Sequence, residues 1–397
     1  AYPGQIIVTE FRQGAGGGND TYVELYNTGP AAPLAGFALS AFSGTVTTLP
    51  STAGILPTGR YFLVTGTIYS HGAVTAADHV SSTLGTGGVR VLAPDTAGTR
   101  IDAAGPTSGY HLGTGLTEMT TGTTGTTGWA WARLQLAGAP RNTSDNASDF
   151  WLVYRSTTLI RGMQPTVGGS SPSNTTSPPP QNAGLQSTLL DPAVNASVEP
   201  NRAYTPAGAG GSPPGTLTIR RTVTNSTALA VSSLTIRVTA LSQAFGAPLP
   251  GVATQPATHA NLRVREPATT TSTVAMSNGT TVSVTNATIN DPNLTTVGAG
   301  LNRALTVNLP DPLAPAASIN VAVHFTVQTV GRFWFGYDVE AALTTPVLTN
   351  AAPTRQHSLL TGPRRSPHRI STLTTGQLRN ETPPRPKSQA WAASGRR

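Results

Sequence analysis

Hydrophobic and polar residues alternate along much of this chain, most regularly in its C-terminal half. From Ile319 to Val327, an apolar residue occupies every second position. Successive residues of a β-strand point to opposite faces of a sheet, so this period indicates strands with one buried face. The same period occurs in three further segments: Leu234–Val238, Leu305–Leu309 and Phe333–Val339.

The N-terminal part of the chain predicts shorter strands, separated by turns rich in glycine, proline and asparagine. Short strands at this spacing, without a helical period, are typical of a β-sandwich. In Thr21–Tyr26, Val23 and Leu25 share one face, and Tyr22, Glu24 and Tyr26 share the other. The predicted strands are Ile6–Phe11, Thr21–Tyr26, Gly36–Ala41, Tyr61–Thr65, Val89–Leu92, Trp129–Leu136 and Phe150–Tyr154.

The patterns predict an all-β protein with two antiparallel, immunoglobulin-like β-sandwich domains, over residues 5–155 and 216–342. Residues 156–215 are rich in Pro, Ser, Asn and Gly, which is typical of a linker, although Leu185–Leu190 could add a strand to the second domain. Residues 343–397 show no period and are rich in Arg, Pro and Ser, which predicts a disordered basic tail.

One arginine interrupts the alternation of the second domain. Arg221 falls at the parity of Leu217, Ile219 and Val223, which are apolar. Two explanations stay open: a β-bulge that shifts the phase of the strand, or a buried guanidinium group with a polar partner.

Several residues of the first predicted domain carry a resemblance to a known family: Glu10, Val23–Asn27 (VELYN), Leu34, Gly36 and Leu56–Val64 (LPTGRYFLV). The pattern resembles the lamin-tail domain, an immunoglobulin-like sandwich also found in secreted bacterial proteins. Phe37 stands where that family usually has tryptophan, and Thr121–Gly128 is an insertion. The second predicted domain resembles one that follows lamin-tail domains in some environmental bacterial proteins. That resemblance implies no function.

The formal net charge of +8 belongs to the tail and not to the predicted domains. Residues 1–351 carry 16 arginines and 16 acidic residues, whereas the remainder carries nine basic residues and one acidic residue. Arg364, Arg365 and Arg369 are therefore the candidates for contact with nucleic acid. We do not predict nucleic acid as a partner of the folded domains. The tail could also be an out-of-frame translation of GC-rich DNA, because the chain has only one lysine.

Several classes of chemistry are excluded by composition. The chain has no cysteine, which removes disulfides and thiolate sites. Its one lysine, Lys387, lies in the tail, which excludes a P-loop, and the G-x-S-x-G and H-E-x-x-H motifs are absent. No apolar run is long enough to span a membrane. We expect an extracellular or cell-envelope location, with any targeting segment already absent from a chain that begins at Ala1.

Two groups of oxygen-bearing side chains are candidate metal sites. Glu10, Asp20 and Glu24 flank one glycine-rich loop and would suit a hard cation such as Ca²⁺, the one cofactor considered. Alternatively, backbone or arginine groups donate hydrogen bonds to both glutamates and fix the sandwich edge. A second group contains Asp145, Asn146 and Asp149, without the glycine and final glutamate of an EF-hand loop, and it could instead cap a turn.

Two tryptophans are candidates for sugar binding. Trp129 and Trp131 share one strand face, with Ala130 and Ala132 on the other. They could form an exposed aromatic platform for polysaccharide, or they could pack in the core of the sandwich.

The sequence therefore predicts a non-catalytic protein. We expect an exported structural or adhesive protein of the bacterial cell surface or extracellular matrix, with self-association or other surface proteins as partners. The alternative is a binding or targeting module for polysaccharide or extracellular DNA, since lamin-tail domains often accompany secreted nucleases and phosphatases. A metal-dependent hydrolase using Glu10, Asp20 and Glu24 is the third hypothesis.

Overall fold

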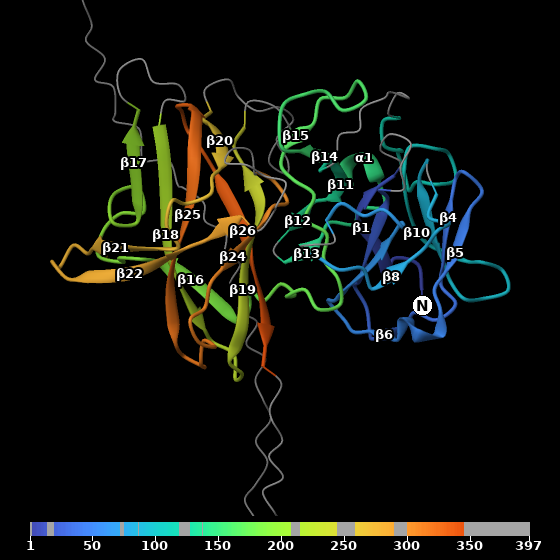
Figure 1. The fold of residues 1–397 in the computed structure, drawn as a ribbon, viewed down its shortest axis with the longest axis horizontal. Coiled ribbons are helices and arrows are strands. Elements are labelled where there is room, and N and C mark those ends of the chain that lie inside the picture. Colours follow the sequence, from blue (N-terminus) through green and yellow to red (C-terminus); the bar gives the residue numbers. More distant parts are fainter. Residues whose placement is uncertain are drawn as a thin grey trace, which may run out of the picture.

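The computed structural model of this chain contains two β-sandwiches that lie side by side (Figure 1). It describes residues 2–13, 20–71, 75–85, 87–118, 128–136, 138–207, 215–243, 259–289 and 300–344. Within these ranges the secondary structure is almost entirely β, apart from the short helix α1 (Asn146–Asp149) and the 3₁₀ turn Ser51–Ala53. The predicted all-β, sandwich-like fold is confirmed.

The first sandwich packs a seven-stranded sheet against a four-stranded sheet. The larger sheet has the order β15 (Thr166–Val167), β14 (Phe150–Tyr154), β11 (Ala130–Arg133), β1 (Ile6–Arg12), β2 (Tyr22–Asn27), β7 (Tyr61–Thr65) and β8 (His79–Val80). The smaller sheet has the order β10 (Arg100–Ala104), β9 (Val89–Leu92), β4 (Ala38–Ala41) and β5 (Val46–Thr48). Two short pairs lie outside these sheets: β3 (Ala32–Pro33) with β6 (Ile55–Leu56), and β12 (Gln135–Leu136) with β13 (Ala139–Pro140).

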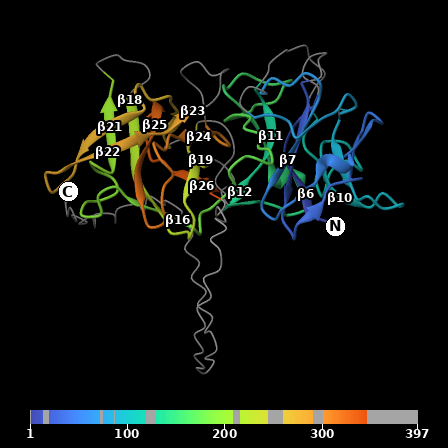
Figure 2. The same cartoon turned by 60° about the horizontal axis from the view of Figure 1, so that its bottom comes forward.

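The second sandwich also has a seven-stranded and a four-stranded sheet. The larger sheet follows the path β16 (Leu185–Leu189), β18 (Gly215–Asn225), β25 (Ser318–Thr329), β22 (Thr281–Asn286) and β21 (Thr271–Ala275), with β17 (Arg202–Pro206) also paired to β18 and β20 (Asn261–Val264) to β25. The smaller sheet has the order β23 (Thr288–Ile289), β24 (Ala304–Val307), β19 (Val231–Leu241) and β26 (Phe335–Leu343). Figure 2 shows the same side-by-side arrangement of the two sandwiches from a second direction.

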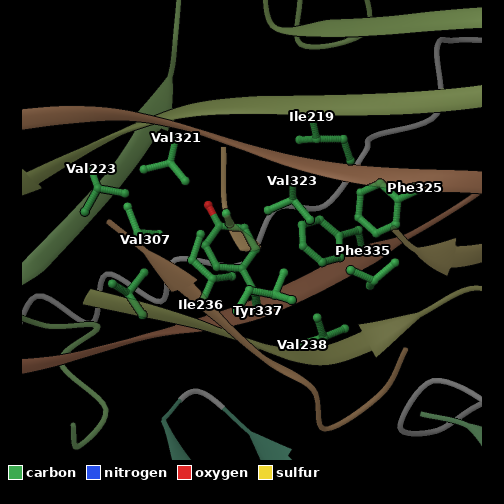
Figure 3. Packing of buried hydrophobic residues seen from close by; sticks show 14 of the residues in the cluster. Ile219, Val223, Ile236, Val238, Val307, Val321, Val323, Phe325, Phe335 and Tyr337 are labelled. Carbon is green, nitrogen blue, oxygen red and sulfur yellow. The ribbon is translucent and has the colours of Figure 1, made fainter. Parts of the chain in front are cut away.

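The period-2 pattern of the second sandwich produces its core. Val323 and Phe325 of β25 meet Phe335 and Tyr337 of β26 between the two sheets (Figure 3). The Phe325 and Phe335 rings make an edge contact with centroids 4.9 Å apart, a favourable arrangement for aromatic pairs. Burial of these side chains supplies the main driving force for closing the two sheets.

The sequence had predicted purely antiparallel sheets, but the structure also contains parallel pairs. β14–β15, β7–β8 and β22–β25 are parallel pairs. Each of these pairs has only two residues in register, so none of them builds a long parallel ladder.

Arg221 is a buried guanidinium group, and no bulge shifts its strand. β18 and β25 keep one continuous register from Gly215 to Thr224, and Arg221 faces Val321 within it. The residue is 7% exposed, and its Nη1 donates to the Arg220 carbonyl oxygen at 2.7 Å.

The linker predicted over residues 156–215 is wrong for much of its length. β15 joins the first sandwich, and β16 and β17 join the second. Residues 168–184, which we term the connecting segment, pack between the sandwiches, and Pro180 forms a bridge with Glu340 of β26. Proline and serine content indicated a solvated chain, but here the serine hydroxyl and backbone groups find partners in both sandwiches.

The connecting segment passes very close to the second sandwich at Gly168. A Cβ atom at this position would lie 2.3 Å from the Leu301 carbonyl oxygen, and the Gly169 N–H donates to that oxygen at 3.0 Å. Only glycine allows the two backbones to approach this closely.

The larger sheet of the first sandwich is covered on both faces. Val23 and Leu25 of β2 point into the sandwich core, as predicted. On the opposite face Tyr22 packs with Leu301 of the second sandwich, and Glu24 is buried as well. The face that carries both candidate glutamates is therefore an interface between the two sandwiches.

Candidate functional site

A β-bulge places the two candidate glutamates opposite each other. The register of β1 on β2 shifts between Val8 and Glu10, so that Glu10 pairs directly with Glu24. Both carboxylates then point out of the first sandwich toward the connecting segment. Like charges directly opposite each other on a sheet are destabilising unless other groups compensate.

Glu10 receives hydrogen bonds from both sandwiches and from the connecting segment. Its Oε1 accepts from the Tyr22 hydroxyl at 2.5 Å and from the Ser171 N–H at 3.0 Å. Its Oε2 accepts from Nδ2 of Asn302 at 2.7 Å. These donors satisfy the buried carboxylate, so Glu10 links three parts of the chain.

Glu24 contacts Thr9 and the connecting segment. Its Oε1 accepts from the Thr9 hydroxyl, and its Oε2 accepts from the Ser173 N–H. Burial raises the pKa of Glu24 from 4.5 to about 8, and the nearby charge of Glu10 adds to this rise. Glu24 therefore takes up a proton when the interface forms at neutral pH.

Arg237 supplies the positive charge of this interface from β19. Its Nε donates to Glu340 Oε1 at 2.5 Å, and its Nη2 donates to the Ser173 hydroxyl at 3.0 Å. Its Nη1 donates to the Ser171 carbonyl oxygen at 3.2 Å. Burial opposes the charge on Arg237, but Glu340, Tyr61 and Glu24 together more than offset this effect, and the pKa of the guanidinium is raised.

We refer to Glu10, Glu24, Ser171, Ser173, Arg237, Asn302 and Glu340 together as the interdomain cluster. It holds three carboxyl groups and one guanidinium group, all buried. Since one cation cannot balance three buried carboxylates, the raised pKa of Glu24 is the expected physical response. Chemically, the cluster joins the two sandwiches through charge-assisted hydrogen bonds.

Asp20 does not join the two glutamates. Its Oδ1 accepts from Nη2 of Arg12 at 2.5 Å and from the Ser70 N–H at 3.0 Å. Arg12 is buried, and its ion pair with Asp20 separates this carboxylate from Glu10 and Glu24 of the candidate metal site. Within the described ranges, no three His, Cys, Asp or Glu side chains are grouped closely enough to hold a metal ion. The alternative of hydrogen-bonded glutamates fits the contacts, although they fix the interdomain face and not the sandwich edge.

The second candidate group is also divided among protein partners. Asn146 donates from Nδ2 to the Ala103 carbonyl oxygen at 3.0 Å, and Asp145 Oδ1 accepts from the Thr114 N–H at 2.6 Å. Asp149 forms an ion pair with Arg133 at 3.0 Å. These side chains tie helix α1 to distant parts of the first sandwich. Asp145, at the N-cap of α1, makes no side-chain capping hydrogen bond, so these contacts differ from the turn cap that the sequence suggested.

Arg133 explains why the β1 bulge is tolerated. The guanidinium is fully buried and pairs with Asp102 Oδ2 at 3.2 Å as well as with Asp149. Its Nε donates to the Val8 carbonyl oxygen, and Asp102 accepts from the Val8 N–H, each at 2.7 Å. The bulge frees these backbone groups of Val8, and one ion pair from two other strands satisfies both.

Trp129 and Trp131 do not form an exposed platform. They are 2% and 8% exposed, and both pack inside the first sandwich. Ala130 and Ala132, on the opposite strand face, lie against the second sandwich. The platform fails because both faces of β11 are covered, and the core-packing alternative is correct.

Comparison with known proteins gave no match to a protein family, to a curated protein or to a solved structure. The resemblance to lamin-tail domains therefore stays a prediction. Arg364, Arg365 and Arg369 lie outside the described residues. No helix in the described part of the chain has the length and hydropathy of a membrane span.

Sequence reasoning found Glu10 and Glu24 but missed the groups that complete their surroundings. Arg237, Asn302 and Glu340 lie more than 200 positions away from both glutamates in the chain. Arg237 and Glu340 carry no such signal: Arg237 falls at the parity of Ser233 and Thr235 in β19, and Glu340 at the parity of Asp338 in β26. Alternation predicts that these faces are exposed to water, so the ion pair could not be read from either strand.

Proposed function

We propose that this protein is an exported, non-catalytic structural or adhesive protein of the bacterial cell surface or extracellular matrix. The interdomain cluster carries this proposal. Its charged groups contact one another across the interface, which suits a stiff two-sandwich unit better than a site open to substrate. The resemblance of residues 5–155 to lamin-tail domains of secreted proteins agrees with an exported protein.

Edge strands supply the surfaces through which copies of such a unit would associate. β21 ends the path of the larger sheet in the second sandwich, and Thr271, Thr273 and Ala275 on it are exposed. The backbone on its outer side has no neighbouring strand in the described part of the chain. A strand of this kind can pair with an equivalent strand of another copy.

Light scattering and negative-stain microscopy of the full chain over a range of concentrations test the proposal. We expect ordered oligomers or fibres. Thr273→Lys should reduce assembly because it places a charge on the edge strand, whereas Thr58→Lys, at an exposed turn of the first sandwich, should not. A strictly monomeric protein at high concentration would contradict the structural role.

A further inference from the structure

Apolar packing between the two sandwiches is sparse compared with the packing inside them. Each sandwich has its own large apolar core, and neither core contains residues of the other sandwich. Among the described residues, the apolar cluster that spans the interface takes only Leu301 from the second sandwich, which packs with Tyr22, Ala130 and Ala132 of the first. Since apolar burial is the main favourable term in folding, this interface is expected to separate more easily than either core unfolds.

Four buried carboxyl groups meet in this interface. Glu10 and Glu24 of the first sandwich lie directly opposite each other, and Asp338 and Glu340 extend from β26 of the second. Glu340 forms an ion pair with Arg237, and Asp338 accepts from a backbone N–H of the first sandwich at 3.1 Å. Within the described part of the chain, Glu24 belongs to no ion pair. An ionised Glu24 would therefore be costly in the closed interface.

The charge state of Glu24 depends on groups from every element packed around it. Glu10 faces it from β1 and Arg237 from β19, while the connecting segment that covers it has no titratable side chain. Burial and then Glu10 raise the pKa of Glu24 to about 8, and Arg237 offsets only part of this rise. The other titratable groups of this region are Arg12, Asp20, Tyr22, Tyr26, Arg60, Tyr61, Tyr69, His71, Asp78, Arg303, Asp338 and Glu340.

We propose that the interface between the two sandwiches is pH-sensitive and separates when the Glu24 carboxyl group ionises, while each sandwich stays folded. Separation lets water reach Glu24 and relieves its repulsion from Glu10 on the neighbouring strand. The connecting segment then joins two sandwiches that can turn relative to each other. This inference goes beyond the proposed function, because it concerns how stiff one copy is at a given pH and holds whether or not copies associate.

The direction of the effect follows from proton binding. In the closed protein Glu24 holds its proton up to about pH 8, whereas an exposed glutamate releases it near 4.5. Between these values the closed form binds one more proton than the open form, so the equilibrium constant for closure falls about tenfold per pH unit. The constant is highest below pH 4.5 and levels off above pH 8. Burial also raises the pKa of Asp338 and of Glu340, which adds to the fall in the same direction.

Thiol labelling of the full chain tests this proposal, because the chain has no cysteine of its own. Ala132→Cys places a thiol on the face of β11 that lies against Leu301, beside a small cavity between the sandwiches. Ala104→Cys, the matched control, places a thiol in the core of the first sandwich. The rate of reaction with methyl methanethiosulfonate, divided by the rate for an unfolded cysteine peptide at the same pH, measures how far each thiol is protected.

We expect the protection of Ala132→Cys to fall about tenfold or more per pH unit between about pH 5 and 8, and to stay below that of Ala104→Cys throughout. Adding Glu24→Gln should make the fall less steep by about tenfold per unit, whereas adding Glu118→Gln, at an exposed glutamate, should not change it. Equal protection of the two thiols would mean exposure through unfolding alone and would overturn the proposal. Protection that does not change with pH, or the same fall with Glu24→Gln, would also overturn it. If Ala132→Cys does not fold, Ala130→Cys on the same strand face replaces it.

Discussion

Replacing Glu24 by glutamine should change how the stability of this protein depends on pH. Glutamine has nearly the same shape as a protonated glutamate and cannot ionise. Its Oε1 can accept from the Ser173 N–H, and its amide can donate to the Thr9 hydroxyl oxygen, so the contacts of Glu24 are retained. The substitution therefore removes the ionisable carboxyl group of Glu24 but leaves the packing around it almost unchanged.

The pKa values set the size and direction of the effect. The folded protein holds the Glu24 proton up to about pH 8, whereas an ordinary glutamate releases it near 4.5. Between these values the folded state binds more protons than the unfolded state, so the free energy of unfolding falls as pH rises. At 1.36 kcal/mol per pKa unit, the loss above pH 8 is of the order of 3–5 kcal/mol. The contribution is fully present below pH 4.5.

Urea unfolding of the full chain at several pH values from 5 to 9 measures this loss. The Glu24→Gln protein should match the unmodified protein near pH 5 and exceed its stability by several kcal/mol at pH 9. Glu118→Gln, at an exposed glutamate, is the control and should follow the unmodified protein at every pH. Parallel pH profiles for Glu24→Gln and the unmodified protein would refute the assignment of a buried, protonated Glu24.

Three further predictions concern other parts of the fold. His324 accepts from Thr218 and donates to Asn286, and burial lowers its pKa to about 4, so its contribution is present above pH 6.5 and lost as pH falls toward 4. In the His324→Gln protein, the fall in the free energy of unfolding between pH 6.5 and 4, measured in urea, should be smaller by roughly 2–3 kcal/mol. Arg237→Met should cost about 3–5 kcal/mol and split the calorimetric transition, because it leaves Glu340 unpaired at the interface. Trp131→Ala should lower the free energy of unfolding by about 3–5 kcal/mol, measured in urea.

Local sequence patterns predicted many strands of both sandwiches, but not all of them. Tyr61–Thr65, Val89–Leu92 and Phe150–Tyr154 have the predicted bounds, because turn residues flank each apolar run. β10 (Arg100–Ala104) was missed, since Asp102 interrupts its apolar pattern. That carboxylate is buried against Arg133, a partner from another strand that no local pattern reveals.

The candidate site was only half predictable for a similar reason. The antiparallel pairing of the consecutive strands β1 and β2 brings Glu10 and Glu24 together, and two neighbouring strand patterns predict such proximity. Which groups cover them depends on how the second sandwich docks, and docking is decided by shape and polar complementarity over distant segments. Composition was misleading for residues 168–184, since proline and serine suit both a solvated linker and a chain packed between two sheets.

The double burial of β2 bears on how the protein is made. Synthesis proceeds from the N-terminus, so the first sandwich emerges before the residues that cover its outer face. Until they arrive, the polar side chains of Glu10 and Glu24 face water and keep that face hydrated. The carboxyl groups that are costly in the complete interface would thus protect the partly synthesised chain from premature association. Docking of the second sandwich ends that protection.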